Sequence, residues 1–161
     1  MQNLRLRAED IEDIVIMASY LQDAITMMRD IVYQSKSRRF VIMLNRYVWE
    51  NRCPDTGAVL EGAPSPCSRI RTGLHFEDVL KITSQNIAVQ AKEHPMELLS
   101  IDAAELKDGT YHVDFVFSGE GVIRLQCETI SAQMQDIGAP WPAKCHPKHE
   151  ILDILQDENI E

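Results

Sequence analysis

The sequence lacks long hydrophobic runs and has few basic residues. Its longest unbroken apolar stretch, FVIML at 40–44, is far shorter than the roughly 20 residues that a membrane-spanning helix needs. The 16 lysines and arginines are outnumbered by 25 aspartates and glutamates, and the net charge of −9 argues against general nucleic-acid binding. Glycine and proline, with seven residues each, are too few for a collagen-like or low-complexity chain.

Cysteine is also scarce, and nothing near the N-terminus resembles a secretory signal. The opening segment MQNLRLRAED is charged and has no apolar stretch behind it, so we expect a cytoplasmic protein that does not associate with membranes. A chain of 161 residues can bury enough surface to hold a core without disulfides. The four cysteines are therefore expected to be reduced: Cys53, Cys67, Cys127 and Cys145.

The pattern of apolar residues predicts an α+β fold. DIEDIVIMASYLQDA, at 10–24, repeats its apolar residues at helical spacing. Another apolar stripe of helical period, in ETISAQMQDIG at 128–138, predicts a second helix. Between the two helices, β-branched and aromatic residues, alternation and turn residues indicate seven short strands at 25–33, 38–50, 69–76, 78–85, 97–103, 110–117 and 122–127.

The expected architecture is thus a curved, mostly antiparallel sheet or open barrel of about seven strands. It has an N-terminal helix and a C-terminal capping helix, an order of elements that resembles the pleckstrin-homology-like barrel. This likeness concerns the fold alone and implies no function.

Two segments depart from this pattern. NRCPDTGAVLEGAPSPCS, at 51–68, holds three prolines and two glycines, and we expect a loop that is long for a compact domain. The last twelve residues, 150–161, carry five acids and no base. We therefore predict a single α+β domain at 1–142, followed by an acidic C-terminal tail at 143–161.

The tail begins with AKCHPKHE, in which three potential zinc ligands stand close together: Cys145, His146 and His149. A structural zinc site needs four thiolate or imidazole ligands in a tetrahedron. Adjacent residues rarely both reach one ion, and the fourth ligand would have to be Cys53 or Cys67. The other interpretation is an ordinary solvated segment, and we predict no metal site.

Basic residues gather between 36 and 71, where seven bases stand against three acids. In SRIRTGLHF, strand alternation places Arg69, Arg71 and His75 on one face. Converging guanidinium groups suit carboxylate or phosphate, because each fork donates two parallel hydrogen bonds. The plainer interpretation is a solvated strand face, or arginines paired with the chain's own acids. With the arginines of the preceding hairpin and a nearby tryptophan, the candidate ligand-binding residues are Arg38, Arg39, Arg46, Trp49, Arg69, Arg71 and His75.

Catalytic motifs are missing. No glycine-rich phosphate loop, HExxH, EF-hand or nucleophile elbow is present, so we predict no catalytic residue and no cofactor. His75 does stand close to Glu77 and Asp78, and a carboxylate beside an imidazole favours acid–base chemistry. A small enzyme with a site near His75 and the 51–68 loop is therefore the alternative.

Several blocks resemble a family of small conserved bacterial proteins, known chiefly from alphaproteobacteria and classed as a domain of unknown function. These blocks are LQDAITMMRDIVY, RRFVIMLNRYVWE, RTGLHF and IRLQCETISAQMQDIGAPW…PKH, and the likeness spans most of residues 4–149. The family implies no activity. The positions that resemble its shared blocks are mostly polar or aromatic, which favours a binding surface: Arg38, Arg39, Asn45, Arg46, Trp49, Glu50, Arg71, Gly73, Arg124 and Trp141.

These observations favour a non-enzymatic binding or adaptor module. Its arginine-rich surface would bind a small anionic ligand or an acidic peptide on a partner protein, and the acidic segment 150–161 would compete for that surface within the chain. Besides the small enzyme, a structural subunit of a homo-oligomer remains an alternative.

Overall fold

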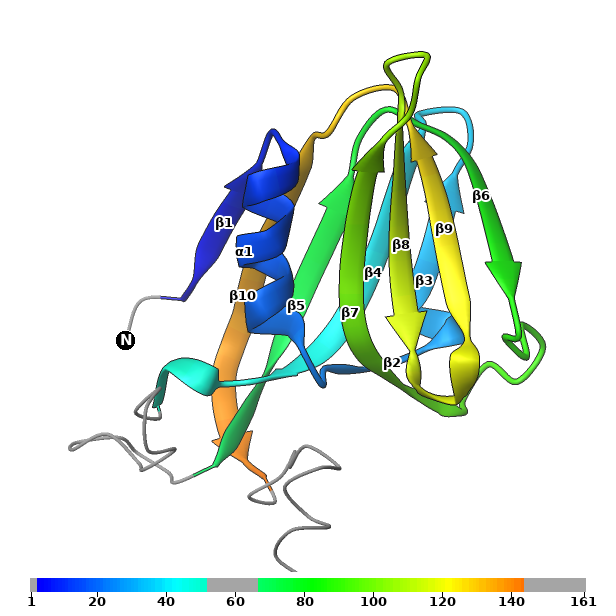
Figure 1. Ribbon diagram of the computed structural model, residues 1–161. Coiled ribbons are helices and arrows are strands. Elements are labelled where there is room, and N and C mark those ends of the chain that lie inside the picture. The colour runs from blue at the N-terminus through cyan, green and yellow to red at the C-terminus, as the bar shows by residue number, and fades with distance from the viewer. Residues whose placement is uncertain (1–2, 52–66, 144–161) are drawn as a thin grey trace, which may run out of the picture.

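In the computed structural model, which describes residues 3–51 and 67–143, ten strands and one α-helix form the fold (Figure 1). The strands are β1 (Arg5–Ala8), β2 (Ile25–Met27), β3 (Ile31–Gln34), β4 (Arg39–Tyr47), β5 (Ser68–Phe76), β6 (Val79–Gln85), β7 (Pro95–Glu105), β8 (Tyr111–Phe117), β9 (Val122–Cys127) and β10 (Ala132–Pro142). The helical segments are α1 (Ile11–Leu21) and the single 3₁₀ turns η1 (Met28–Asp30), η2 (Trp49–Asn51) and η3 (Ser118–Glu120).

The strands form one antiparallel sheet in the order β1-β10-β5-β4-β2-β7-β8-β9-β6, with β3 beside β4. The short β2 pairs with β4 on one side and with β7 on the other, so it links the two halves of the sheet. The halves curve until their inner faces meet. Phe40 and Phe76 of the first half lie with ring centroids 5.4 and 5.8 Å from that of Phe115 in the second.

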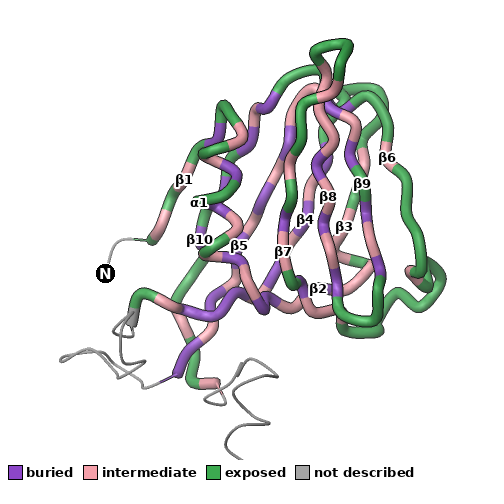
Figure 2. Tube along the Cα trace, viewed as in Figure 1, coloured by how far each residue is buried: buried purple, intermediate pink, exposed green. Residues whose placement is uncertain are grey.

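Alternation along the strands explains the core. In β5 every second residue is buried and the residues between are half-buried, as a strand with one inner and one outer face requires (Figure 2). The helix α1 adds Ile14, Met17 and Leu21, which lie at helical spacing on one face and are buried against the sheet. Asp10 caps this helix, because its carboxylate accepts a hydrogen bond of 2.8 Å from the backbone N–H of Asp13.

The expectation of a mostly antiparallel sheet with an N-terminal helix is confirmed, but the C-terminal helix is wrong. Residues 132–142 form β10, in which Ala132, Met134 and Asp136 are buried and the residues between them are exposed. The sheet also has ten strands rather than about seven, including β1, which the sequence did not predict. The pleckstrin-homology likeness depended on the C-terminal helix and is not supported.

Other expectations concern cysteines and segments at the limits of the described residues. Cys127 is a free, buried thiol, whereas Cys67 forms a disulfide, so the expectation of reduced cysteines is wrong for Cys67. Most of the 51–68 loop, most of the 143–161 tail and the candidate ligands Cys145, His146 and His149 lie outside the described residues. No helix in the described ranges has the length and apolar character needed to cross a membrane.

Candidate functional site

The outer face of β1, β10, β5 and β4 carries a groove of about 490 Å³. The register of the four strands aligns its side chains, because each residue of an antiparallel pair lies directly opposite one partner. Two rows of side chains therefore cross the face: Arg7, Gln133, His75 and Val41 form the first, and Arg5, Gln135, Gly73 and Met43 form the second. We call this feature the outer groove.

Gly73 creates the hollow of the outer groove. A Cβ atom added there would lie 3.3 Å from Met43 Sδ and 3.6 Å from Ile137 Cδ1, so any side chain would occupy the space between these two apolar groups. Val41 lies beside Met43 on the same face of β4. The floor of the groove is therefore apolar, and glycine leaves it open.

Three arginines line the groove. Arg39 Nε lies 2.7 Å from Glu77 Oε1, and Arg7 Nε lies 3.2 Å from Glu9 Oε1, with both members of the second pair 67% exposed. Exposed pairs of this kind hold an arginine only weakly. Arg5 forms no ion pair or hydrogen bond through its side chain within residues 3–51 and 67–143. The guanidinium groups of this rim thus remain accessible to an anion.

His75 brings a titratable group to the same groove. Its Nδ1 lies 3.0 Å from Glu77 Oε1, the atom that Arg39 also contacts. Although the distance suits an ion pair, neither Nδ1 nor Oε1 has a hydrogen bond of good geometry among the described residues. The His75–Glu77 contact is therefore electrostatic, and it is an ion pair only when the imidazole is protonated.

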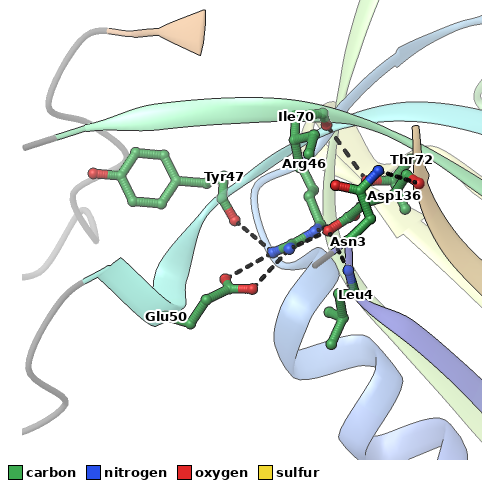
Figure 3. Close-up of polar contacts among 8 residues, drawn as sticks. All are labelled: Asn3, Leu4, Arg46, Tyr47, Glu50, Ile70, Thr72 and Asp136. Atoms are coloured by element: carbon green, nitrogen blue, oxygen red, sulfur yellow. Dashed lines mark hydrogen bonds and ion pairs between the residues drawn. The ribbon is translucent and has the colours of Figure 1, made fainter. Parts of the chain in front are cut away.

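Beneath the groove, on the inner side of the sheet, a buried ion cluster joins β4, β5, β10 and η2 with the residues before β1 (Figure 3). Arg46 donates to Asp136 through Nε and Nη2, at 2.8 and 2.7 Å, and to Glu50 through Nη1 and Nη2, at 2.9 and 2.7 Å. Burial lowers the pKa of Arg46, but its hydrogen bonds to Asp136 and Glu50 and their charges raise the pKa by more. The guanidinium therefore stays charged despite its burial.

Asp136 is the centre of this cluster. Its carboxylate also accepts hydrogen bonds from Thr72 Oγ1, at 2.8 Å, and from the backbone N–H of Leu4, at 3.3 Å. Asn3 Nδ2 donates to the carbonyl of Asp136, at 3.3 Å. These contacts fix the start of β1 against β10, and they thereby determine where Arg5 and Arg7 stand on the rim of the groove.

The structure brings only some of the predicted residues to the outer groove. Arg39 and His75 line it. Arg46 is 1% exposed and its guanidinium faces the opposite side of the sheet, where two carboxylates of the chain contact it. Arg38, with a left-handed backbone at φ 56°, points to Glu128, 3.3 Å away.

The remaining predicted residues lie beyond the end of the groove. Arg71 lies on the same face of β5 as Gly73 and His75, but it does not line the groove. Its guanidinium instead contacts Asp30 at 3.1 Å. Arg69 donates to the carbonyls of Asp23 and Asn45, at 3.2 and 3.0 Å, and burial lowers its pKa against the opposing charges of Asp23 and Glu97. Trp49 Nε1 donates to the carbonyl of Gln22, at 3.1 Å, which anchors η2 to the end of α1.

Four polar residues of the groove were not predicted: Arg5, Arg7, Gln133 and Gln135. The first two belong to β1, whose four residues RLRA are too few for a recognisable alternation. The glutamines belong to the segment that the sequence assigned to a helix. With Leu4, the residues before and within β1 read LRLR, an alternation that was too short to be distinguished from chance.

Within the described ranges, no cluster of histidine, cysteine and acidic residues has the arrangement of a metal site. The groove instead offers guanidinium, imidazole and amide groups over an apolar floor. Such groups bind carboxylates and phosphates through charge-assisted hydrogen bonds.

Comparison with known proteins places this site within a recognised family. Residues 4–149 match the family model described as "Protein of unknown function (DUF2948)", and this span includes every residue of the groove. No curated protein and no solved structure matches the chain. The matched span covers most of the sequence, and the chain therefore belongs to this family of proteins of unknown function.

Proposed function

We propose that this protein is a non-enzymatic binding module whose outer groove takes an anionic ligand or an acidic peptide. The observation that supports this is that Arg5, Arg7 and Arg39 all line one groove of about 490 Å³ with an apolar floor. Ligand sites of this size typically combine apolar walls with a few polar groups that orient the ligand. The three guanidinium groups can only donate hydrogen bonds, so a ligand that meets them supplies the acceptors and the negative charge.

The chain as a whole is acidic, and this limits how an anion can reach the groove. With a net charge of −9, the protein repels anions at long range, so binding at the groove depends on short-range contacts rather than on steering. The rim arginines are exposed, and their attraction to an anion is therefore screened by salt.

The test measures binding of a fluorescein-labelled hexaglutamate peptide by fluorescence anisotropy. In the double variant Arg5→Gln/Arg7→Gln we expect affinity to fall about tenfold, or roughly 0.7 kcal/mol for each exposed arginine. The matched control is Arg29→Gln/Arg124→Gln, which removes two exposed arginines away from the groove. Equal loss in both double variants would show that net charge, and not the groove, binds the peptide.

The enzyme alternative keeps one specific observation in its favour, because His75 lines the groove and its Nδ1 lies 3.0 Å from Glu77 Oε1. An imidazole beside a carboxylate can act as a general base. The probe is p-nitrophenyl acetate, an activated ester. An enzyme predicts an enhanced hydrolysis rate that His75→Gln abolishes and that the matched control His112→Gln, on β8, retains. An equal hydrolysis rate in all three proteins would exclude this enzyme alternative and retain the proposal of a binding module.

A further inference from the structure

The outer groove changes from cationic to apolar along a single row. Neighbouring strands lie about 4.8 Å apart, so Arg5 on β1 is about 10 Å from Gly73, two strands away. The apolar hollow over Gly73 follows, with Met43 and Ile137 as its walls. A ligand that fills the row must therefore carry a negative charge at one end and an apolar group about 10 Å away.

The middle of the groove presents two free amides. Gln133 and Gln135 are exposed, and among the described residues neither side chain forms a hydrogen bond. A side-chain amide can donate and accept at once, which matches the alternating N–H and C=O groups of a peptide backbone. This favours a peptide as the occupant over a free phosphate or carboxylate.

An extended peptide with an acid two residues before an aliphatic residue has the required chemistry. Residues i and i+2 of an extended chain point to the same side and lie about 6.8 Å apart, and the length of an arginine side chain covers the remaining distance. The chain itself contains this pattern three times in EILDILQDENIE at 150–161, as Glu150 with Leu152, Asp153 with Leu155, and Glu158 with Ile160.

The position of this segment allows it to reach the groove. β10 leads from Gln135 to Pro142, a distance of seven residues or about 23 Å of extended strand. Residues 143–149 can span a similar distance, at up to about 3.5 Å per residue. They are therefore long enough to lead from Pro142 back to the level of Gln135. The segment also begins where the family match ends, at residue 149, so it lies outside the matched span that contains the groove.

We propose that residues 150–161 bind in the outer groove of the same chain, as an internal acidic peptide that an external ligand must displace. The acids bind Arg5 and Arg7, the backbone contacts Gln133 and Gln135, and an aliphatic side chain enters the hollow over Gly73. This inference rests on the proposed function of the groove. A tethered segment has an effective concentration of about 1 mM, so it weakens external ligands considerably even when its own affinity is modest.

The first experiment uses the full chain with a neutralised segment, Glu150→Gln/Asp153→Asn/Glu158→Gln. We expect labelled hexaglutamate to bind about tenfold more tightly than to the wild type, because the internal competitor is lost. In ¹⁵N spectra the side-chain amide signals of Gln133 and Gln135 should shift. The control Glu12→Gln/Glu105→Gln/Glu120→Gln removes three exposed acids elsewhere. It should change neither the affinity for hexaglutamate nor the amide signals of Gln133 and Gln135.

The second experiment uses Gly73→Val, which fills the hollow without changing charge. Hexaglutamate has no aliphatic side chain, so we expect this variant to bind it more tightly than the wild type does. Weaker binding would overturn the aliphatic contact. If the amide signals of Gln133 and Gln135 change when the protein is diluted, a second copy supplies the segment and the internal contact is wrong.

These outcomes separate the two proposals. When the neutralised segment changes neither hexaglutamate affinity nor the amide signals, the segment does not occupy the groove. The groove itself is then judged by the Arg5→Gln/Arg7→Gln variant alone. If hexaglutamate binds none of the variants but neutralising the segment still shifts the amide signals, the internal contact stands. The proposal of an external acidic ligand is then wrong.

Discussion

Arg46 and Asp136, 90 residues apart in the chain, form a bidentate ion pair across β5, with side chains only 1% and 3% exposed. The strands that carry them, β4 and β10, are not neighbours, because β5 lies between them. The pair therefore ties three strands together under the floor of the outer groove. A buried pair of this kind costs free energy to desolvate, and its loss on one side leaves a buried charge without a partner.

Breaking the pair should destabilise the fold strongly. We expect Asp136→Ala to lower the free energy of unfolding by about 3–5 kcal/mol, because Arg46 stays buried with half of its partners. The double variant Arg46→Met/Asp136→Leu should lose less than Asp136→Ala alone, since it removes both charges. Urea denaturation followed by circular dichroism measures the difference. A double variant less stable than the single one would contradict the role given to the unpaired charge.

The exposed pair of Arg124 and Asp114 provides the contrast. Arg124 Nε and Nη2 lie 2.8 and 2.9 Å from the carboxylate, and the hydrogen bond to Asp114 raises the pKa of Arg124. The Arg124 side chain is 48% exposed, so solvent screens the attraction. We expect Arg124→Gln to cost at most about 1 kcal/mol of stability, and less in high salt. The same denaturation measurement at two salt concentrations tests this; a cost near that of Asp136→Ala would be inconsistent with it.

Cys127 should be chemically inert while the protein is folded. Burial, together with the charge of Asp78, raises the pKa of its thiol to about 12, so almost no thiolate exists at neutral pH. Treatment with iodoacetamide at pH 8, followed by mass spectrometry of the peptide that contains residue 127, should show no alkylation. The same treatment in concentrated urea should modify it fully. Rapid modification of native protein would show that β9 opens more readily than its burial implies.

Asp108 should titrate at an unusually acidic pH. The hydroxyl and then the backbone N–H of Thr110 donate to its carboxylate at 2.7 and 3.0 Å, and these hydrogen bonds lower the pKa of Asp108. Because the folded pKa is the lower one, the stabilisation is present above the unfolded pKa and is lost as pH falls through the folded pKa. In an NMR titration, Thr110→Val should raise the pKa of Asp108, whereas Thr83→Val on β6 should leave it unchanged.

The fate of β10 shows why the sequence predicted the core of the fold better than its site. α1, β8 and β9 display clean apolar periods, so local pattern was sufficient there. In β10 the inward positions are Ala132, Met134 and Asp136, and the aspartate breaks the apolar alternation. It is buried only because Arg46 pairs with it, a contact that no local pattern reveals.

The error in β10 then concealed the groove. With residues 132–137 assigned to a helix, nothing placed Gln133 and Gln135 beside His75, and nothing gave Arg5 and Arg7 a strand to pair with. For Arg46 the prediction failed in the other direction. Its charge suggested an exposed contact with a ligand, but the structure buries its side chain. Sequence showed which charged residues the chain carries, whereas the side of the sheet on which each one lies followed from long-range pairing.

The pairing of β1 with β10 also sets when the groove can exist during synthesis. Leu4 and Asp136, which hold the edge of the groove together, are 132 residues apart, so a ribosome working at about 5–20 residues per second separates them by on the order of ten seconds. Throughout that interval Arg5 and Arg7 are attached to a strand without a partner. A nascent chain of this protein therefore carries Arg5 and Arg7 long before β10 exists, and a product that stops before β10 lacks one of the four strands that form the outer groove.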